Sequence, residues 1–380
     1  MQAPLASVVV DSYNYGRFLA QAIDSALAQT YPRTEVIVVD DGSTDESTDV
    51  IAEYGDRIIP LLKENGGQAS AFNAGFARSR GDVVVFLDSD DALLPSAVGE
   101  AVGALADPET AKVHWPLIVI DENGHRTGEM VETELLDGDF RELVLREGPM
   151  TEATLKSAPT SGNAFARQFL ERILPMPERL YWTMPDDYLY GLAPAFGRIR
   201  ALGEPQGLYR LHGDNWYGRL SFEAKLSHGV RDHEQQSRVL RERCAELGIE
   251  PDLSTWRARA WWPRIERSVR EIEALVPPGD TFVFIDQGEW EAEELVRGRR
   301  RLPFPGRNGV YWGLPENDAA AIAELERLRH EGAGFLVFAW SAFWWLEEYQ
   351  AFGEHVRSTC RCVLENDRLL VFALRVGGET

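Results

Sequence analysis

The sequence predicts an α/β protein whose main sheet is largely parallel and covered by helices on both faces. In the first 90 residues, short apolar runs rich in Val and Ile alternate with segments of helical spacing. Polar residues directly follow three of those runs, at Tyr13-Asn14, Asp40-Asp41 and Asp88 to Asp91. Because parallel strands end at one edge of their sheet, we expect the three loops to converge there, where open α/β sheets bind ligands.

The elements of the first half are expected in regular order. The pattern predicts strands over 7–10, 35–39, 58–62 and 83–87, and helices over 18–29, 47–54 and through 72–76. Beyond them the pattern is less regular. A strand over 112–120 leads into a hairpin turn at 121–124, and a helix starts at Pro185.

The second half is expected to hold a separate, smaller α/β unit. Polar helical segments over 222–247 and 255–275 read as a connector, and Pro277-Pro278-Gly279-Asp280 marks a boundary. After it we expect strands over 281–285, 335–338, 360–364 and 368–374, with helices over 318–331 and 344–356. The aromatic run at 343–346 is interpreted mainly as core, because its spacing is helical.

Composition excludes several classes of protein. The 380 residues carry a net charge of -22, which argues against a nucleic-acid partner. Three cysteines indicate a reducing compartment without a disulfide framework. Neither a signal peptide nor an apolar run long enough to cross a membrane is evident. We expect a cytoplasmic protein. Peripheral contact with the inner face of the membrane and homo-oligomer formation are left open.

The stretch from Val83 to Asp91 is the most informative part of the chain. An apolar strand runs directly into Asp88, Asp90 and Asp91. Carboxylates this close repel one another unless a cation or a proton intervenes. Hard Mg²⁺ or Mn²⁺ prefers oxygen ligands and could also hold phosphate oxygens. The alternative is an acidic turn in which Ser89 or Asp91 caps the next helix.

Four motifs in the first half occur in a characteristic order and spacing. They are Ser7 to Asn14 (Ser-Val-Val-Val-Asp-Ser-Tyr-Asn), Val39 to Asp45 (Val-Asp-Asp-Gly-Ser-Thr-Asp), Asn65 to Gln68 with Asn73 to Gly75, and Phe86 to Asp91. Together they resemble family 2 glycosyltransferases of the GT-A fold over about residues 5–215. The chain departs from that family at Asp11, where a neutral pair is usual.

The resemblance implies a mixed GT-A sheet flanked by helices and a division into four parts. Residues 1–110 would form the nucleotide-sugar-binding half and 111–217 the acceptor-binding half. The helical connector would span 218–276, and the small C-terminal α/β domain 277–380.

The resemblance also implies a donor site. Tyr13 would flank the nucleotide base, and Asp41 would accept a hydrogen bond from N3–H, which favours uracil or thymine. The expected donor-binding residues are Ser12, Tyr13, Asn14, Asp41, Gly67, Asn73, Asp88 and Ser89. The alternatives are plain packing for Tyr13, and simple turn formation for Asp41 and for Gly66-Gly67.

For the metal, the resemblance implies Asp90 as the firmest ligand. Asp88 would be shared between ribose and metal, and His212 would reach the metal or the diphosphate. Imidazole suits Mn²⁺ better than Mg²⁺, and both ions are left open. A structural role for His212 is the alternative.

Catalysis is expected from the second half of the GT-A domain. Asp186-Asp187 resembles the family's acid pair at a helix start, which makes Asp187 the general base and Asp186 its neighbour. Helix capping is the alternative. Ser161, Gly162 and Asn163 resemble the loop that lines the acceptor pocket.

The sequence therefore predicts an inverting, metal-dependent glycosyltransferase that uses a nucleoside diphosphate sugar, with a UDP-sugar expected. The acceptor is left open between a glycan, a lipid-linked glycan, a metabolite and a peptide. Two other functions compete with this one: a sugar nucleotidyltransferase, and a non-catalytic protein that binds sugar nucleotides or glycans. The former would need a Gly-rich phosphate loop after the first strand, which the turn at Tyr13 to Gly16 is not.

Overall fold

The computed structural model describes residues 3–131, 133–154, 156–213, 220–290, 295–307 and 310–374. The chain forms two compact units. Unit 1 comprises residues 1–219 and 231–261, and unit 2 comprises 220–230 and 262–380.

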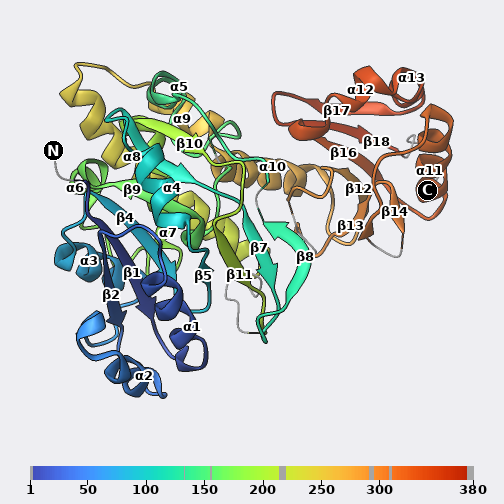
Figure 1. The fold of residues 1–380 in the computed structure, drawn as a ribbon. Coiled ribbons are helices and arrows are strands. Elements are labelled where there is room, and N and C mark those ends of the chain that lie inside the picture. Colours follow the sequence, from blue (N-terminus) through green and yellow to red (C-terminus); the bar gives the residue numbers. More distant parts are fainter. Residues whose placement is uncertain are drawn as a thin grey trace. The chain divides into compact units, whose positions relative to one another are not determined.

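The main sheet of unit 1 has seven strands in the order β10-β6-β9-β4-β1-β2-β3 (Figure 1). Their bounds are β1 (Ala6–Ser12), β2 (Thr34–Asp40), β3 (Ile59–Leu62), β4 (Val83–Asp88), β6 (Thr110–His114), β9 (Asn163–Ala166) and β10 (Arg198–Ala201). β1 is parallel to β2 and β4, and β2 is parallel to β3. β9 runs antiparallel to both β4 and β6. The predicted mixed α/β sheet is therefore confirmed.

Both faces of this sheet are buried. Val8 and Val10 pack in one core with residues of α1 (Gly16–Leu27), α2 (Ser47–Tyr54) and α4 (Ala97–Ala104). Val9 packs on the opposite face, in a core shared with α3 (Gln68–Arg78), α5 (Arg141–Glu147), α6 (Arg167–Ile173) and α7 (Pro185–Phe196). Because alternate residues face two apolar layers, the strand is a continuous apolar run.

A second sheet of unit 1 has the order β5-β11-β7-β8. Its strands are β5 (Ala92–Leu93), β7 (Leu117–Ile120), β8 (Arg126–Val131) and β11 (Gly207–Arg210). The single strand predicted over 112–120 is wrong, because β6 and β7 belong to different sheets. They are separated by Trp115-Pro116, and Pro116 has no N–H for a ladder. The hairpin turn at 121–124 is confirmed.

The helices predicted as a connector contribute to both units. α8 (Phe222–Glu246) has residues in each, α9 (Leu253–Arg259) lies in unit 1, and α10 (Trp261–Leu275) lies almost entirely in unit 2. One continuous helix over 255–275 was expected, but Ala260 has ψ 137°, which is extended backbone and separates α9 from α10. The four-part division of the chain stays a prediction.

Unit 2 is the expected small α/β unit, with the strand order β13-β12-β16-β18-β17. Its elements are β12 (Thr281–Ile285), β13 (Arg300–Pro303), α11 (Asp318–His330), β16 (Phe335–Ala339), α12 (Trp345–Glu348), α13 (Gln350–Thr359), β17 (Arg361–Glu365) and β18 (Leu369–Ala373), with the short pair β14 (Gly306–Arg307) and β15 (Val310–Tyr311). Short 3₁₀ turns are η1 (Gly55–Arg57) and η2 (Thr160–Gly162) in unit 1 and η4 (Trp340–Ala342) in unit 2. The helix expected over 344–356 is split into α12 and α13.

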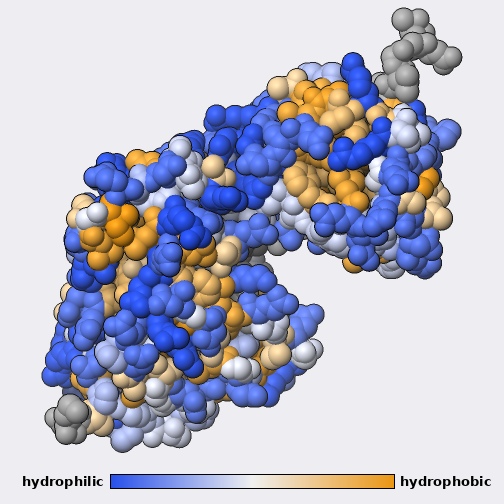
Figure 2. Space-filling view, turned by 90° about the horizontal axis from the view of Figure 1, so that it is seen from above, coloured by the Kyte–Doolittle hydropathy of each residue, from blue (hydrophilic) through white to orange (hydrophobic). Residues whose placement is uncertain are grey.

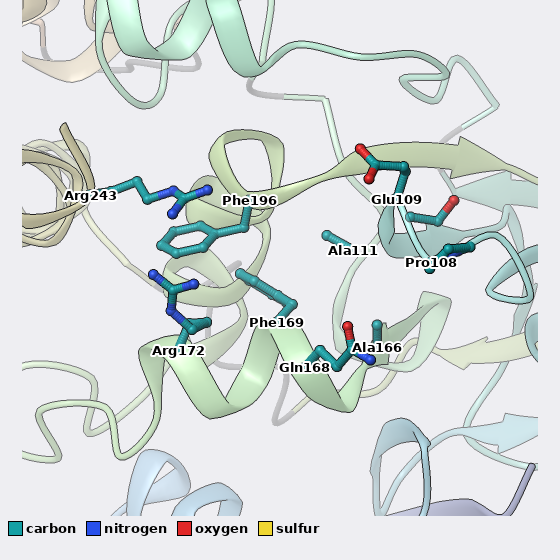
Figure 3. Close-up of a pocket in the computed structure, with 10 residues that line it drawn as sticks. Pro108, Glu109, Ala111, Ala166, Gln168, Phe169, Arg172, Phe196 and Arg243 are labelled. Carbon is teal, nitrogen blue, oxygen red and sulfur yellow. The ribbon is translucent and has the colours of Figure 1, made fainter. Parts of the chain in front are cut away.

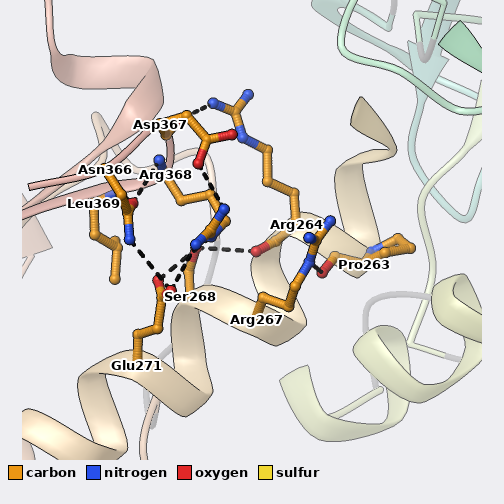
Figure 4. A network of polar contacts seen from close by, with 9 residues as sticks. All are labelled: Pro263, Arg264, Arg267, Ser268, Glu271, Asn366, Asp367, Arg368 and Leu369. Carbon is orange, nitrogen blue, oxygen red and sulfur yellow. Dashed lines mark hydrogen bonds and ion pairs between the residues drawn. The ribbon is translucent and has the colours of Figure 1, made fainter. Parts of the chain in front are cut away.

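Within unit 2, α10 is tied to the turn between β17 and β18 (Figure 4). Glu271 Oε1 accepts hydrogen bonds from Arg368 Nη2 at 2.6 Å and Asn366 Nδ2 at 3.2 Å.

Trp345 is fully buried, as expected of a core aromatic, whereas 39% of Trp344 is exposed.

Hydrophilic side chains cover most of the face drawn in Figure 2, with smaller hydrophobic areas between them. Within the described part of the chain, every helix is too short or too polar to span a membrane.

Candidate active site

Three loops meet at the carboxyl edge of the main sheet, as the sequence predicted. Strand register pairs Asp11 of β1 with Asp88 of β4, and Ser12 with Asp40 of β2. The carbonyl of Ser12 also accepts the N–H of Asp41 at 2.9 Å. The parallel register of three neighbouring strands therefore brings acidic residues from all three to one place.

A cluster of three carboxylates lies at the end of β4. One oxygen each from Asp88, Asp90 and Asp91 lies within 4.8 Å of the others. Desolvation raises the pKa of Asp88, and the charges of Asp11 and Asp90 raise it further. Desolvation, followed by the charge of Asp90, raises the pKa of Asp91. Desolvation, followed by the charge of Asp90, raises the pKa of Asp11 to about 8. The cluster holds more negative charge than its surroundings compensate.

A carboxylate oxygen of the cluster and one of its neighbour Asp11 are buried and have no hydrogen-bond partner among the described residues. They are Oδ1 of Asp11 and Oδ2 of Asp91. A buried unpaired carboxylate oxygen is costly, and a hard divalent cation would both pair such oxygens and relieve the repulsion. The residues present therefore fit Mg²⁺ or Mn²⁺.

His212 reaches this cluster from the segment after β11. Its Nε2 lies 2.9 Å from Oδ2 of Asp90, and its side chain is fully buried. The ring packs near Tyr15 and Phe18, with centroid separations of 5.4 and 5.1 Å. The structure thus brings together Asp90 and His212, which the sequence proposed as metal ligands.

The interpretation of Asp91 or Ser89 as a helix cap is wrong. Asp91 is followed by β5, and the next helix, α4, has Ser96 at its N-cap. Instead, Oδ1 of Asp91 accepts the backbone N–H of Arg210 at 2.9 Å, while Arg210 Nε donates to the carbonyl of Asp90 at 2.8 Å. Asp91 thus joins the second sheet to the end of β4. Ser89 is buried, and its donor role stays a prediction.

Asp41 is buried and organises the loop before α3. Its carboxylate accepts the N–H of Gly66 at 3.0 Å, the N–H of Gly67 at 2.8 Å and Lys63 Nζ at 2.5 Å. Gly67 has φ +84°, and a Cβ there would lie 2.7 Å from the Trp182 ring. Contact with a nucleotide base stays a prediction for Asp41, whose oxygens already accept these three donors.

Tyr13 and Asn14 form the tip of the first loop. Tyr13 is 47% exposed, which argues against plain packing as its role. Asn14 has φ +58°, and its Oδ1 accepts the N–H of Thr44 at 2.8 Å while its own N–H donates to Ser43 Oγ at 2.9 Å. Asn14 thus joins the loops after β1 and β2.

Two predicted ligand-binding amides serve the protein's own loops. Asn73 Oδ1 accepts the N–H of Met176 at 2.9 Å, and its Nδ2 donates to the carbonyl of the same residue at 3.0 Å. Asn163 Nδ2 donates to the carbonyls of Ala158 at 2.9 Å and Pro159 at 2.7 Å. Both amides have structural partners, so direct donor or acceptor binding by them stays untested.

The remaining residues of the proposed acceptor loop are also buried. Ser161 Oγ accepts the N–H of Asp88 at 3.2 Å, so it supports the carboxylate cluster. A Cβ on Gly162 would lie 2.5 Å from the Cβ of Ala158. This glycine is needed for close packing.

The acid pair lies in the first turn of α7, which begins at Pro185. Asp187 Oδ1 accepts the hydroxyl of Tyr190, one turn further along. The charge of Asp186 is one of those that raise the pKa of Asp88. Asp186 therefore lies near enough to the cluster to act on it electrostatically.

Sequence reasoning did not assign a role to Gln68. Its Nε2 donates to Oδ1 of Asp88 at 2.8 Å, and its side chain also forms a hydrogen bond with Asp11. Gln68 is the first residue of α3 and follows directly on the loop held by Asp41. Its position in the Asn65 to Gln68 motif was the one signal that could have found it.

A separate pocket lies at the opposite edge of the sheet (Figure 3). Ala166, which lines it, pairs with the first residue of β4. Arg172 and Arg243 lie 5.8 and 5.5 Å from the Phe196 ring, and both pair with Glu246. No predicted site residue lines it.

A helix-flanked mixed sheet with a carboxylate cluster at its carboxyl edge, together with the family match over its first strands, places the chain among glycosyltransferases of the GT-A fold class. The chain belongs to glycosyl transferase family 2, whose model matches residues 7–165. An uncharacterized glycosyltransferase of Nostoc sp. (strain PCC 7120) is 33% identical over 280 residues, which cover 70% of this chain and 85% of that protein.

Other similarities are shorter or more distant. The hyaluronan synthase of Pasteurella multocida is 42% identical over 100 residues, 26% of this chain and 10% of that one. Among solved structures, S. aureus TarS 1–349 in complex with UDP-GlcNAc has a TM-score of 0.44 and 17% identity, over 67% of this chain and 79% of that one. A mannosyltransferase from Pyrobaculum calidifontis, in complex with GDP-Man and Mn²⁺, has a TM-score of 0.44 and 18% identity, over 73% and 77% of the two chains.

Proposed function

We propose that this glycosyltransferase is metal-dependent and inverting, and that it transfers a sugar from a UDP-sugar to an acceptor hydroxyl. The observation that carries the proposal is the cluster of Asp88, Asp90 and Asp91 at the carboxyl edge of the sheet. It lies within electrostatic reach of Asp186, the neighbour of the proposed base in the first turn of α7.

Asp88, Asp90 and His212 would hold Mn²⁺ or Mg²⁺. When bound, the ion supplies positive charge that stabilises the diphosphate as it leaves. The unpaired oxygens of Asp11 and Asp91 and the repulsion within the cluster support a cation there.

The nucleoside would lie along the loops after β1 and β2. Tyr13 offers an exposed ring that can stack on a base. Asp41 would accept N3–H, and this preference for uracil rests on the family resemblance. Asn14 would fix the two loops relative to each other through its contacts with Ser43 and Thr44.

Transfer would occur in a single displacement. The acceptor oxygen forms a bond to the anomeric carbon while the bond from that carbon to the diphosphate oxygen breaks. The proton of the acceptor hydroxyl passes to the carboxylate of Asp187, which acts as general base.

Asp187→Asn tests the chemistry separately from binding. We expect the variant to keep the Mn²⁺-dependent thermal shift with UDP, because Asp187 is not a proposed donor ligand. Turnover of the donor should fall by at least about 100-fold, a typical contribution of a general base. The assay is UDP release from a panel of UDP-sugars, with water as acceptor where no acceptor is known.

GDP-sugars in the same panel test whether the donor nucleotide carries uracil or guanine. Glu250→Gln, at an exposed position, serves as the matched control for Asp187→Asn. Unchanged turnover in Asp187→Asn would mean that another residue is the general base. Binding without turnover of any donor would favour the non-catalytic alternative. Pyrophosphate release from a nucleoside triphosphate and a sugar phosphate would favour a nucleotidyltransferase.

A further inference from the structure

A buried lysine of unit 1 lies close to Tyr190 of α7. Lys112 belongs to β6 and is 2% exposed. Its Nζ contacts Ser157 Oγ and lies 5.6 Å from the centroid of the Tyr190 ring. Burying an ammonium group is costly unless its charge is compensated, so this position calls for an explanation.

Tyr190 connects Lys112 to the proposed base. It lies on α7 and donates its hydroxyl to Oδ1 of Asp187. Desolvation and the charges of Asp187 and Asp186 raise the pKa of Tyr190 well above its usual value. The phenol therefore keeps its proton and remains a hydrogen-bond donor.

The titratable groups around Lys112 lie on two elements, α7 and its own strand β6. Desolvation lowers the pKa of Lys112 to about 7, and the charge of Asp186 on α7 acts in the opposite direction. His114, on the same strand, is buried. Desolvation first and then Lys112 lower its pKa, so it stays neutral. Lys112 thus feels the negative charge of Asp186 on α7, while His114 on its own strand is neutral.

The start of α7 is also fixed from α8. Gln236 Nε2 donates to the carbonyl of Asp187 at 3.0 Å and to Oδ2 of Asp232 at 2.8 Å. The hydroxyl of Tyr181 donates to the other oxygen of Asp232. With the backbone of Asp187 held in this way, the hydroxyl of Tyr190 contributes to the orientation of its carboxylate.

We propose that Lys112 is a positioning residue that acts through Tyr190 on the acid pair Asp186–Asp187. It holds the Tyr190 ring so that the hydroxyl fixes the carboxylate of Asp187. When Lys112 is protonated, its positive charge also stabilises the carboxylate of Asp186 beside the cluster. This inference rests on the proposed function, in which Asp187 is the base.

The direction of the effect on pH dependence follows from electrostatics. A nearby cation and a donated hydrogen bond both favour the ionised carboxylate. Removing either one raises the proton affinity of the pair. The acidic limb of the pH–rate profile should therefore move to higher pH, which a purely structural role would not produce.

The test measures donor turnover against pH for four proteins: wild type, Lys112→Met, Lys112→Arg and Tyr190→Phe. We expect Lys112→Met and Tyr190→Phe to move the acidic limb upward by about one pH unit, and to lower kcat about tenfold, the effect of losing one charged hydrogen bond. Lys112→Arg keeps the charge and should lie closer to wild type. Tyr190→Phe removes a single oxygen, so it remains informative if Lys112→Met folds poorly.

Thermal shift with UDP and Mn²⁺ separates the outcomes. The three variants should show the same thermal shift as wild type, because none of the substitutions affects a proposed donor ligand. An acidic limb that stays in place in Tyr190→Phe and Lys112→Met, with turnover intact, overturns the role of Lys112 alone. Absence of any UDP shift in wild type overturns the proposed function instead.

Discussion

At the residue scale, one glycine holds the loop before α3 in place. Gly67 has φ +84°, a conformation that costs an L-residue free energy, and its N–H donates to Asp41. Its backbone also lies against Trp182, so a side chain there meets the indole at 2.7 Å. The loop geometry that presents Gln68 to Asp88 thus depends on the absence of a Cβ.

Gly67→Ala is therefore expected to lower the free energy of unfolding by about 1–3 kcal/mol, from backbone strain and overlap together. Urea denaturation of both proteins measures the difference. Gly99→Ala is the matched control. Gly99 lies within α4 with open space around it, so alanine should be neutral or stabilise by up to about 1 kcal/mol. Equal effects of the two substitutions would contradict the role of Gly67.

The sequence predicted where the charged residues gather, but not which partners the amide residues have. Asp88, Asp90 and His212 could be placed together because strand ends and a family motif constrain them. Asn73 and Asn163 carry the same motif signals, yet their amides bond to loop backbone. An amide can serve a ligand or a loop equally well, and only the tertiary structure decides.

At the element scale, strands β1 and β2 are joined at the amino edge by a carboxylate. Glu35 Oε1 accepts the Ser7 hydroxyl at 2.7 Å and the N–H of Arg80 at 2.6 Å. Desolvation acts to raise the pKa of Glu35, but these hydrogen bonds and the Arg80 charge outweigh it and hold that pKa below its usual value. Glu35 thus links two strands and the turn before β4.

Because the pKa of Glu35 is lower in the folded state, its carboxylate stabilises the fold at pH values above the unfolded pKa of about 4.5. This stabilisation is lost as the pH falls through the pKa of the folded state. Glu35→Gln should cost about 1–2 kcal/mol at pH 7, allowing for the exposed Arg80 partner. Its difference from wild type should shrink as the pH falls below about 4.5. Urea denaturation at several pH values checks this, and a difference that is constant with pH would contradict it.

Element boundaries were predicted well where the hydrophobic periodicity was strong. They were missed where one or two residues divide a predicted strand or helix into two elements. The strands and helices of the first 90 residues agree with the pattern within a few residues. The breaks at Trp115-Pro116 and at Ala260 were missed. At both places apolar spacing continues through a change in backbone direction, which spacing alone does not record.

At the scale of the whole molecule, the chain divides into two units, and the site residues described above belong to unit 1. The predicted boundary at 277–280 marks the start of the unit 2 sheet, but α10 before it already packs in unit 2. Proline and glycine show where a helix ends, and they do not show which core its apolar face joins.

The net charge of -22 includes the acidic cluster, whose internal repulsion destabilises the folded molecule. Binding of a cation and a nucleoside diphosphate to the folded state alone should therefore raise the melting temperature of the unit that holds the site. At 100 times the dissociation constant, the stabilisation is about 2.7 kcal/mol, which corresponds to a shift of a few degrees.

The most direct measurement is the thermal shift produced by UDP with Mn²⁺ in wild type, Asp90→Ala and Asp56→Ala. Asp56 is exposed in the 3₁₀ turn η1 and serves as the matched control. We predict a shift of a few degrees in wild type and Asp56→Ala that requires both Mn²⁺ and UDP, and no shift in Asp90→Ala. A shift of equal size in Asp90→Ala would contradict the placement of the metal and diphosphate at the end of β4.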